Sequence, residues 1–124
     1  MKIESAKDLT VYKKSYDLAM ILSKLSKSFP AEERFALTSQ SRRSSRPVCM
    51  NLREAWAKRR YEAHFISKLS DCDGENSATD TTLDFARDCD YITEEKHKEC
   101  IGLNREVGRM LGAMMSNPEK FLLR

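Results

Sequence analysis

The sequence predicts an all-α fold, an up-down-up-down antiparallel four-helix bundle that forms a single domain over residues 1–124. Three observations favour it. The chain has four Gly and three Pro among 124 residues, so helix breakers are scarce. Four segments carry apolar residues at spacings of three and four, which place them on one helix face. The connections between the segments are short, as between antiparallel neighbours in a bundle.

The first helix is expected from Asp8 or Leu9 to Ser28. Its apolar stripe, expected to face the core, is formed by Tyr12, Tyr16, Ala19, Leu22, Leu25 and Phe29. Pro30 ends the turn, and Glu32 and Glu33 follow. Acidic residues favour the N-terminus of a helix, so these two are expected to lead into the second helix.

The second helix is expected from Leu37 to Tyr61, with a kink near Pro47 because proline lacks the backbone N–H that a helix interior needs. The alternative is that Pro47 separates two shorter helices. The residues on the line that can face a core are Leu37, Ser41, Ser44, Val48, Leu52 and Ala55.

The third helix is expected from near Tyr61 to Cys89. Its bundle seam is formed by Phe65, Leu69, Cys72, Asn76, Thr79, Leu83 and Ala86. Asn76 and Thr79 are polar where a core would be apolar. They are expected to pair with each other, to line a wet channel, or to fix register and assembly state.

The fourth helix is expected to follow Thr93 as its N-cap, with Glu94 and Glu95 in the first turn. Its inward stripe is expected at Cys100, Leu103, Val107, Met110 or Leu111, and Met114. Gly108 and Gly112 would let another helix approach closely. Asn117 and Pro118 stop the helix, and the tail residues Phe121, Leu122 and Leu123 are expected to dock on a neighbour.

A line of basic and aromatic residues is the strongest chemical signal. As a helix, the second segment places Arg42, Arg46, Cys49, Arg53, Trp56 and Arg60 on one face over about 27 Å. Seven basic residues lie between residues 42 and 60, against Glu54 as the single acid. Residues 71–95 contain nine acidic residues and a single basic one, Arg87. The basic face therefore meets an external polyanion, the acidic segment of this chain, or that of another copy.

Metal, cofactor and catalytic motifs are not evident. An EF-hand calcium loop needs Gly at its sixth position and a bidentate acid at its twelfth. Counted from Asp71, these positions hold Asn76 and Thr82, so the segment does not fit an EF-hand. Of possible zinc ligands only His97 and Cys100 are close in sequence, and two ligands do not make a structural site. Neither a nucleophile elbow nor a phosphate-binding glycine loop is present. We expect no metal, no cofactor and no enzymatic activity.

The cysteines and the N-terminus indicate the compartment. Cys49, Cys72, Cys89 and Cys100 lack paired spacing, so reduced thiols buried as small hydrophobes are expected. No run of 18 apolar residues and no signal-peptide core occurs in the sequence. The expectation is a soluble cytoplasmic protein that does not contact a membrane.

Two functional hypotheses follow. In the first, the bundle is a non-enzymatic homo-oligomer that binds RNA or another nucleic acid with little base specificity. Its expected nucleic-acid-binding residues are Arg42, Arg46, Arg53, Trp56, Lys58, Arg59 and Arg60. In the second, the bundle is a protein-interaction scaffold, and the basic helix of one subunit packs on the acidic helix of the next. A third, an enzyme using carboxylates of the third helix, would need a convergent pocket.

Nearly the whole chain resembles a known family. The resemblance rests on DLTVYKKSYDLAMILSKLSKSFPAEERFALTSQ at residues 8–40, then on Arg42, Arg43, Asn51 and Glu54, and on Phe65, Leu69, Gly74, Thr81, Leu83, Ala86, Asp88 and Tyr91. These features are similar to the small bacterial four-helix bundle proteins encoded in intervening sequences of large-subunit ribosomal RNA genes, also called a ribosomal protein family.

The resemblance implies a four-helix bundle that assembles as a ring, expected to be a pentamer. It also implies a relation to the accessory protein of diversity-generating retroelements, which works with a reverse transcriptase and RNA. This chain departs from the family pattern at Ala55 and Trp56, where a glycine-containing segment is usual. It departs again at Asp73, Asn76 and Thr79, where aliphatic residues are usual.

Overall fold

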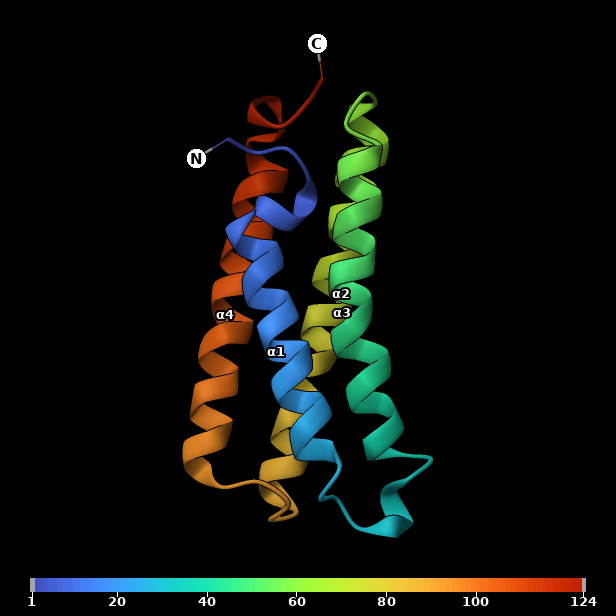
Figure 1. The fold of residues 1–124 in the computed structure, drawn as a ribbon, viewed down its shortest axis with the longest axis vertical. Coiled ribbons are helices and arrows are strands. Elements are labelled where there is room, and N and C mark those ends of the chain that lie inside the picture. Colours follow the sequence, from blue (N-terminus) through green and yellow to red (C-terminus); the bar gives the residue numbers. More distant parts are fainter. Residues whose placement is uncertain (1, 124) are drawn as a thin grey trace.

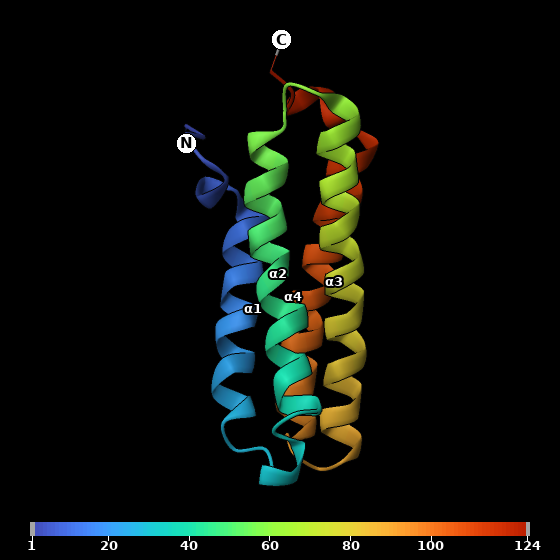
Figure 2. The same ribbon diagram turned by 90° about the vertical axis from the view of Figure 1, so that its right-hand side faces the viewer.

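Four long helices run alternately up and down in the computed structural model, which describes residues 2–123 (Figure 1). They are α1 (Thr10–Ser26), α2 (Leu37–Ala57), α3 (Glu62–Asp88) and α4 (Glu94–Ser116), with short 3-10 helices η1 (Ala6–Asp8), η2 (Ala31–Glu33) and η3 (Pro118–Lys120). Consecutive helices pack on each other and α1 packs on α4, as the turned view in Figure 2 also shows. This arrangement confirms the predicted all-α four-helix bundle.

The helix ends differ slightly from the predicted ones. Helix α2 ends at Ala57 because the Lys58 N–H donates to the carbonyls of both Glu54 and Ala55, which tightens the last turn. Residues 58–60 therefore form a turn, and the predicted extension of this helix to Tyr61 is wrong. Helix α2 continues through Pro47, so it does not divide there, and a kink at Pro47 stays a prediction.

Side-chain caps start two elements. The Thr93 hydroxyl accepts a hydrogen bond from the Lys96 N–H at 3.0 Å, which confirms Thr93 as the N-cap of α4. Before α1, Ser5 and Asp8 form a capping box around η1, which the sequence did not predict. These caps satisfy N–H groups that helix geometry leaves without a partner.

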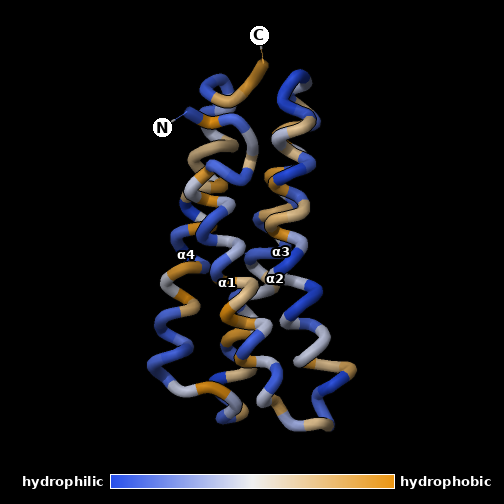
Figure 3. The backbone as a smooth tube through the Cα atoms, in the orientation of Figure 1, coloured by the Kyte–Doolittle hydropathy of each residue, from blue (hydrophilic) through white to orange (hydrophobic). Residues whose placement is uncertain are grey.

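The core forms two apolar clusters, one toward each end of the bundle. The first contains Leu9, Val48, Leu52, Phe65, Leu69 and Leu111 among others, and the second contains Leu18, Leu22, Phe29, Leu83 and Ile101 among others. Figure 3 shows hydrophobic stretches interrupted by hydrophilic ones along the helices. All seven predicted seam residues of α3 are buried, and so is the predicted core line of α2 except the half-buried Leu37.

The buried polar side chains of Asn76, Thr79 and Asn104 lie near the middle of α3 and α4. The Asn76 amide donates to the Asn104 carbonyl at 2.9 Å, and the Asn104 amide donates to the Asn76 carbonyl at 2.8 Å and to its Oδ1 at 3.1 Å. Thr79 donates to the Glu75 carbonyl of its own helix at 2.9 Å. Asn76 therefore pairs with α4 rather than with Thr79.

The stripe on α1 agrees with the predicted one at the buried residues Ala19, Leu22 and Phe29 and differs from it at Tyr16. Tyr16 is 51% exposed, whereas Ser15, Leu18 and Ser26 are buried. Serine can face the core here because its hydroxyl donates to a carbonyl of the preceding turn, as Ser15 does to Val11 at 2.7 Å. The prediction that Tyr16 faces the core is wrong.

The fourth helix follows the prediction, and so does the tail as far as Leu122, whereas Leu123 is 46% exposed. Cys100, Val107, Leu111 and Met114 are buried, while Leu103 is half-buried. The ring of Phe121 lies 6.2 Å from that of Phe65, and Leu122 also packs on the core. A Cβ on Gly108 would meet Asn76 at an ordinary 3.5 Å, and one on Gly112 would meet open space, so neither gives an unusually close approach within the chain.

The described residues contain no helix that is both long and apolar enough to cross a membrane.

Candidate nucleic-acid interface

The predicted binding residues fall into three groups in space. Arg42, Arg46 and Arg53 lie along α2 and line hollows that α1 residues also line. Trp56 and Arg59 contact each other at the C-terminal end of α2. The exposed residues Lys58 and Arg60 lie in the turn between α2 and α3. The structure thus separates a line that the sequence placed on one helix face.

A groove of about 310 Å³ lies on the surface where α1 and α2 meet. Arg46 and Arg53 flank it, and the other residues that line it are Tyr12, Tyr16, Ala19, Met20, Cys49 and Met50. Met20 is 55% exposed and Met50 is 65% exposed. Large apolar side chains left open beside arginines are typical of a surface that binds a partner.

Arg46 and Arg53 are free to neutralise an anion. Arg46 donates from Nη2 to the Ser23 hydroxyl across the α1/α2 seam at 3.3 Å, which holds it beside the groove. Within residues 2–123, none of the seven basic residues between positions 42 and 60 forms an ion pair with a carboxylate. Neutralisation by the acidic segment of the same chain is therefore not seen.

Three acids of α3, namely Asp71, Asp84 and Asp88, pair with basic residues outside α2. Lys68 pairs with Glu54 at 2.8 Å and with Asp71 at 3.7 Å. At the other end of α3, Arg87 pairs with Asp88 at 2.9 Å and lies 4.0 Å from Asp84. These partly exposed pairs contribute little to stability, and among residues 2–123 none of them neutralises a basic residue of α2.

Arg42 lies further along the same seam. It lines a hollow of about 340 Å³ with Lys27 and Arg34 at the end of α1, and no carboxylate of residues 2–123 lines that hollow. Its Nε is buried and has no hydrogen-bond partner among the described residues. The positive potential of the groove therefore continues toward the α1–α2 connection.

Trp56 and Arg59 are engaged with each other. The guanidinium carbon of Arg59 lies 3.7 Å from the centre of the Trp56 ring, and its Nε donates to the Trp56 carbonyl at 2.8 Å. Arg59 Nη1 also donates to the Phe121 carbonyl at 3.4 Å, and burial lowers the pKa of Arg59. This pair fastens the tail to the α2–α3 turn.

Six of the eight residues that line the groove were not predicted as binding residues: Tyr12, Tyr16, Ala19, Met20, Cys49 and Met50. The alternative stripe Val11, Ser15, Leu18, Leu22 and Ser26, which has the same spacing, would have placed Tyr16 at the surface. The pairing of α1 residues with Met50 depends on how α1 and α2 lie side by side, and a single sequence does not give that.

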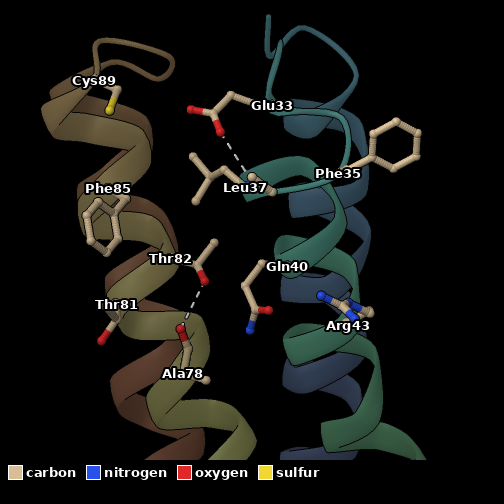
Figure 4. A pocket seen from close by; sticks show the side chains of 11 residues that line it. Glu33, Phe35, Leu37, Gln40, Arg43, Ala78, Thr81, Thr82, Phe85 and Cys89 are labelled. Atoms are coloured by element: carbon tan, nitrogen blue, oxygen red, sulfur yellow. Dashed lines mark hydrogen bonds between the residues drawn. The ribbon is translucent and has the colours of Figure 1, made fainter. Parts of the chain in front are cut away.

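Another hollow, of about 630 Å³, lies between α2 and α3 near η2 and is called the α2/α3 hollow (Figure 4). Leu37, Gln40, Thr82 and Phe85 are among the residues that line it, and Arg43 lies at its edge. In Figure 4 the Phe35 ring points away from α3. Phe35 is 85% exposed and Phe85 is 59% exposed, so this side of the bundle also presents apolar area.

Side chains suited to metal binding do not gather into a cluster in the described part of the chain. Residues 2–123 contain no cluster of three His, Cys, Asp or Glu side chains able to hold a metal ion. His97 contacts Asp84 Oδ1 through Nε2 at 2.8 Å, and Arg87 Nη1 lies 3.4 Å from the same ring nitrogen. His97 is buried and lines neither the α1/α2 groove nor the α2/α3 hollow.

The thiols are free, with one exposed. Cys49, Cys72 and Cys100 are buried, as predicted, but Cys89 is exposed at the edge of the α2/α3 hollow. Cys89 follows the last residue of α3, where the chain turns out of the bundle. The prediction that all four are buried is wrong for Cys89.

Comparisons with known proteins agree on one family. The family model for the 23S rRNA-intervening sequence protein matches residues 7–113. A crystal structure of a protein of unknown function from the S23 ribosomal protein family of Bacteroides thetaiotaomicron VPI-5482 is 28% identical, with a TM-score of 0.80. That match covers 90% of this chain and 99% of the other. No curated protein matches the chain. These matches do not show the expected relation to retroelement accessory proteins. With a family model matching most of its length and a similar fold in a member of known structure, the chain belongs to the 23S rRNA-intervening sequence protein family.

Proposed function

We propose that this protein is a non-enzymatic nucleic-acid-binding bundle that holds phosphates along the seam between α1 and α2. The observation that carries the proposal is that Arg46 and Arg53 flank an open groove and form no ion pair within residues 2–123. Arginine binds phosphate through a planar, bidentate fork. The family description links its members to an intervening sequence of 23S rRNA, so RNA is the first nucleic acid to test.

The remaining basic residues have different places in this proposal. Arg42 extends the positive seam toward η2, and Lys58 and Arg60 offer exposed charge beyond the end of α2. Trp56 and Arg59 bind each other, so we assign them to the packing of the tail. Most of the affinity would come from phosphate neutralisation, which gives little sequence preference.

Charge reversal tests the proposal. Fluorescence anisotropy with a labelled RNA would compare the wild type with the double variant Arg46→Glu/Arg53→Glu at matched ionic strength. The expected loss of affinity is about tenfold or more, because two phosphate contacts become repulsions. The matched control, Lys98→Glu/Arg109→Glu, makes the same change in net charge on α4. Equal losses in the two variants, or none in either, would overturn the α1/α2 site.

A second function is favoured by the apolar surface on the other side of α2. Phe35 and Phe85 expose large ring area around the α2/α3 hollow. In this alternative the bundle is a scaffold, and the basic α2 of one subunit packs on the acidic α3 of the next. Such a contact joins unlike faces, so repetition gives a ring where the rotation between subunits closes and an open filament where it does not. Five subunits are the number that the sequence resemblance implies.

Light scattering distinguishes the alternative. A ring held by α2 and α3 charges would dissociate in high salt, since exposed ion pairs are screened. Arg53→Glu and Phe85→Ala would each give smaller particles. A particle size that neither salt nor these variants change would remove the scaffold contact.

A further inference from the structure

The groove between α1 and α2 has a chemistry that phosphate binding alone does not use. A double helix keeps its bases stacked inside and presents mainly phosphates to a protein that does not read its grooves. The groove combines two arginines with Tyr16, Met20 and Met50, all of them substantially exposed. Exposed aromatic and thioether groups next to cations suit a ligand that carries both flat apolar faces and negative charge.

The aromatic part of the groove is held in place. Tyr12 is half-buried, and the ring of Tyr16 lies 6.2 Å from it at 24°, within the range of stacked aromatic pairs. Tyr12 therefore fixes Tyr16 against α1 while about half of Tyr16 faces solvent. A ring held in this way loses little conformational entropy when a base stacks on it.

The charged part of the groove surrounds that ring. Arg46 and Arg53 are seven residues apart on α2, or about 10 Å along the helix axis. No carboxylate of residues 2–123 lines the groove; Asp17 lies in the adjacent hollow with Lys7 and Lys13, on the other side of the tyrosines. A strand that crosses the groove would meet arginine on either side of the aromatic surface.

We infer that the α1/α2 groove takes a single-stranded segment of nucleic acid, with one base against Tyr16 between Met20 and Met50 and the flanking phosphates on Arg46 and Arg53. This inference rests on the proposed function and narrows its ligand to unpaired strands. A volume of about 310 Å³ is at the small end of ligand pockets, which suits one planar heterocycle. Base stacking on aromatic side chains tolerates any base.

The test compares one RNA strand alone with the same strand in a duplex, by fluorescence anisotropy at matched salt. We expect the single strand to bind more tightly. Tyr16→Ala should weaken single-strand binding by about 5- to 150-fold, the range for loss of a stacked base, and leave duplex binding unchanged. Tyr16→Phe keeps the ring and should retain the affinity.

A second variant makes the test independent of Tyr16. Met50→Glu puts a negative charge into the groove at an exposed position, where it should not affect folding, and should also weaken single-strand binding. Equal affinities for strand and duplex, unaffected by Tyr16→Ala and Met50→Glu, would overturn the inference and leave the proposed function standing. No binding of either RNA would overturn both. If Tyr16→Ala instead dissociates an oligomer and leaves RNA affinity unchanged, the groove is covered by a second copy of the chain.

Discussion

Asn76 and Asn104 join α3 to α4 through three hydrogen bonds between their buried amides and backbones. Each amide satisfies groups of the other, so the polar layer costs little while both are present. Deletion of one partner is a different matter, because the other keeps a buried polar atom with no donor.

We expect Asn104→Leu to lower the free energy of unfolding by about 1–3 kcal/mol, because Asn76 Oδ1 then lacks its donor. In the double variant Asn76→Leu/Asn104→Leu no amide is left unsatisfied, so most of that loss should be recovered. Urea denaturation of the wild type, Asn76→Leu, Asn104→Leu and the double variant measures both effects. A double variant as unstable as the sum of the single ones would show that the layer acts through something other than this pair.

The thiols provide a second prediction at this scale. Burial raises the pKa of Cys49 and of Cys100 to about 11 and that of Cys72 to about 12, from an ordinary value near 9. A thiol reagent at pH 8 should therefore modify Cys89 rapidly and the other three only after unfolding. The count of modified thiols before and after guanidinium gives the answer, with Cys89→Ser as the control. Rapid modification of any thiol in the folded Cys89→Ser protein would contradict the prediction that the other three thiols are protected by burial.

The same pKa values set a sign for stability at high pH. The folded state keeps these thiols neutral, so its pKa values lie above those of the unfolded chain. The associated stability is complete below about pH 9 and is lost as pH rises through 11 to 12.

Among the helices, α4 has a start set by one side chain. The Thr93 hydroxyl satisfies the Lys96 N–H, so Thr93→Ala should cost about 0.5–2 kcal/mol, while Thr93→Ser should keep most of the stability. Urea unfolding of the two variants is the measurement. Equal losses in both would mean that the threonine methyl, and not the cap, matters.

How far a helix could be predicted depended on how its polar residues are satisfied. All seven residues predicted for the α3 seam from Phe65 to Ala86 are buried, because the seam keeps one period of three and four throughout, and only the buried Thr82 was missed. The α1 stripe was predicted one residue off at Ser15, because burial of a serine depends on a bond from its hydroxyl to the Val11 carbonyl. The end of α2 was placed too late because nothing in the sequence marks the tightened turn at Lys58.

The candidate site was predicted in part for a related reason. Arg46 and Arg53 follow from helical spacing alone, so the sequence was enough to name them. Tyr16, Met20 and Met50 join them only because α1 lies antiparallel beside α2, and that pairing is a tertiary property. Trp56 has the right spacing too, but Arg59 binds it from the turn beyond the helix.

Over the whole molecule, charge is divided between faces that do not neutralise each other within residues 2–123. Arg42, Arg46 and Arg53 of α2 line the seam with α1. Asp71 and Asp88 of α3 pair with Lys68 and Arg87 on other parts of the surface. A bundle with such a division can bind a polyanion or a second copy of itself. Only for binding of a polyanion should the salt dependence of the affinity follow the number of phosphates contacted.

The most direct measurement is therefore the slope of log affinity against log salt for a labelled single-stranded RNA. Each phosphate contact adds about 0.7 to the magnitude of that slope. For Arg46→Gln/Arg53→Gln we predict a slope smaller by about 1.4 than that of the wild type, since two contacts are lost. The control variant Lys98→Gln/Arg109→Gln should keep the wild-type slope. An unchanged slope in the seam variant would contradict phosphate binding by Arg46 and Arg53.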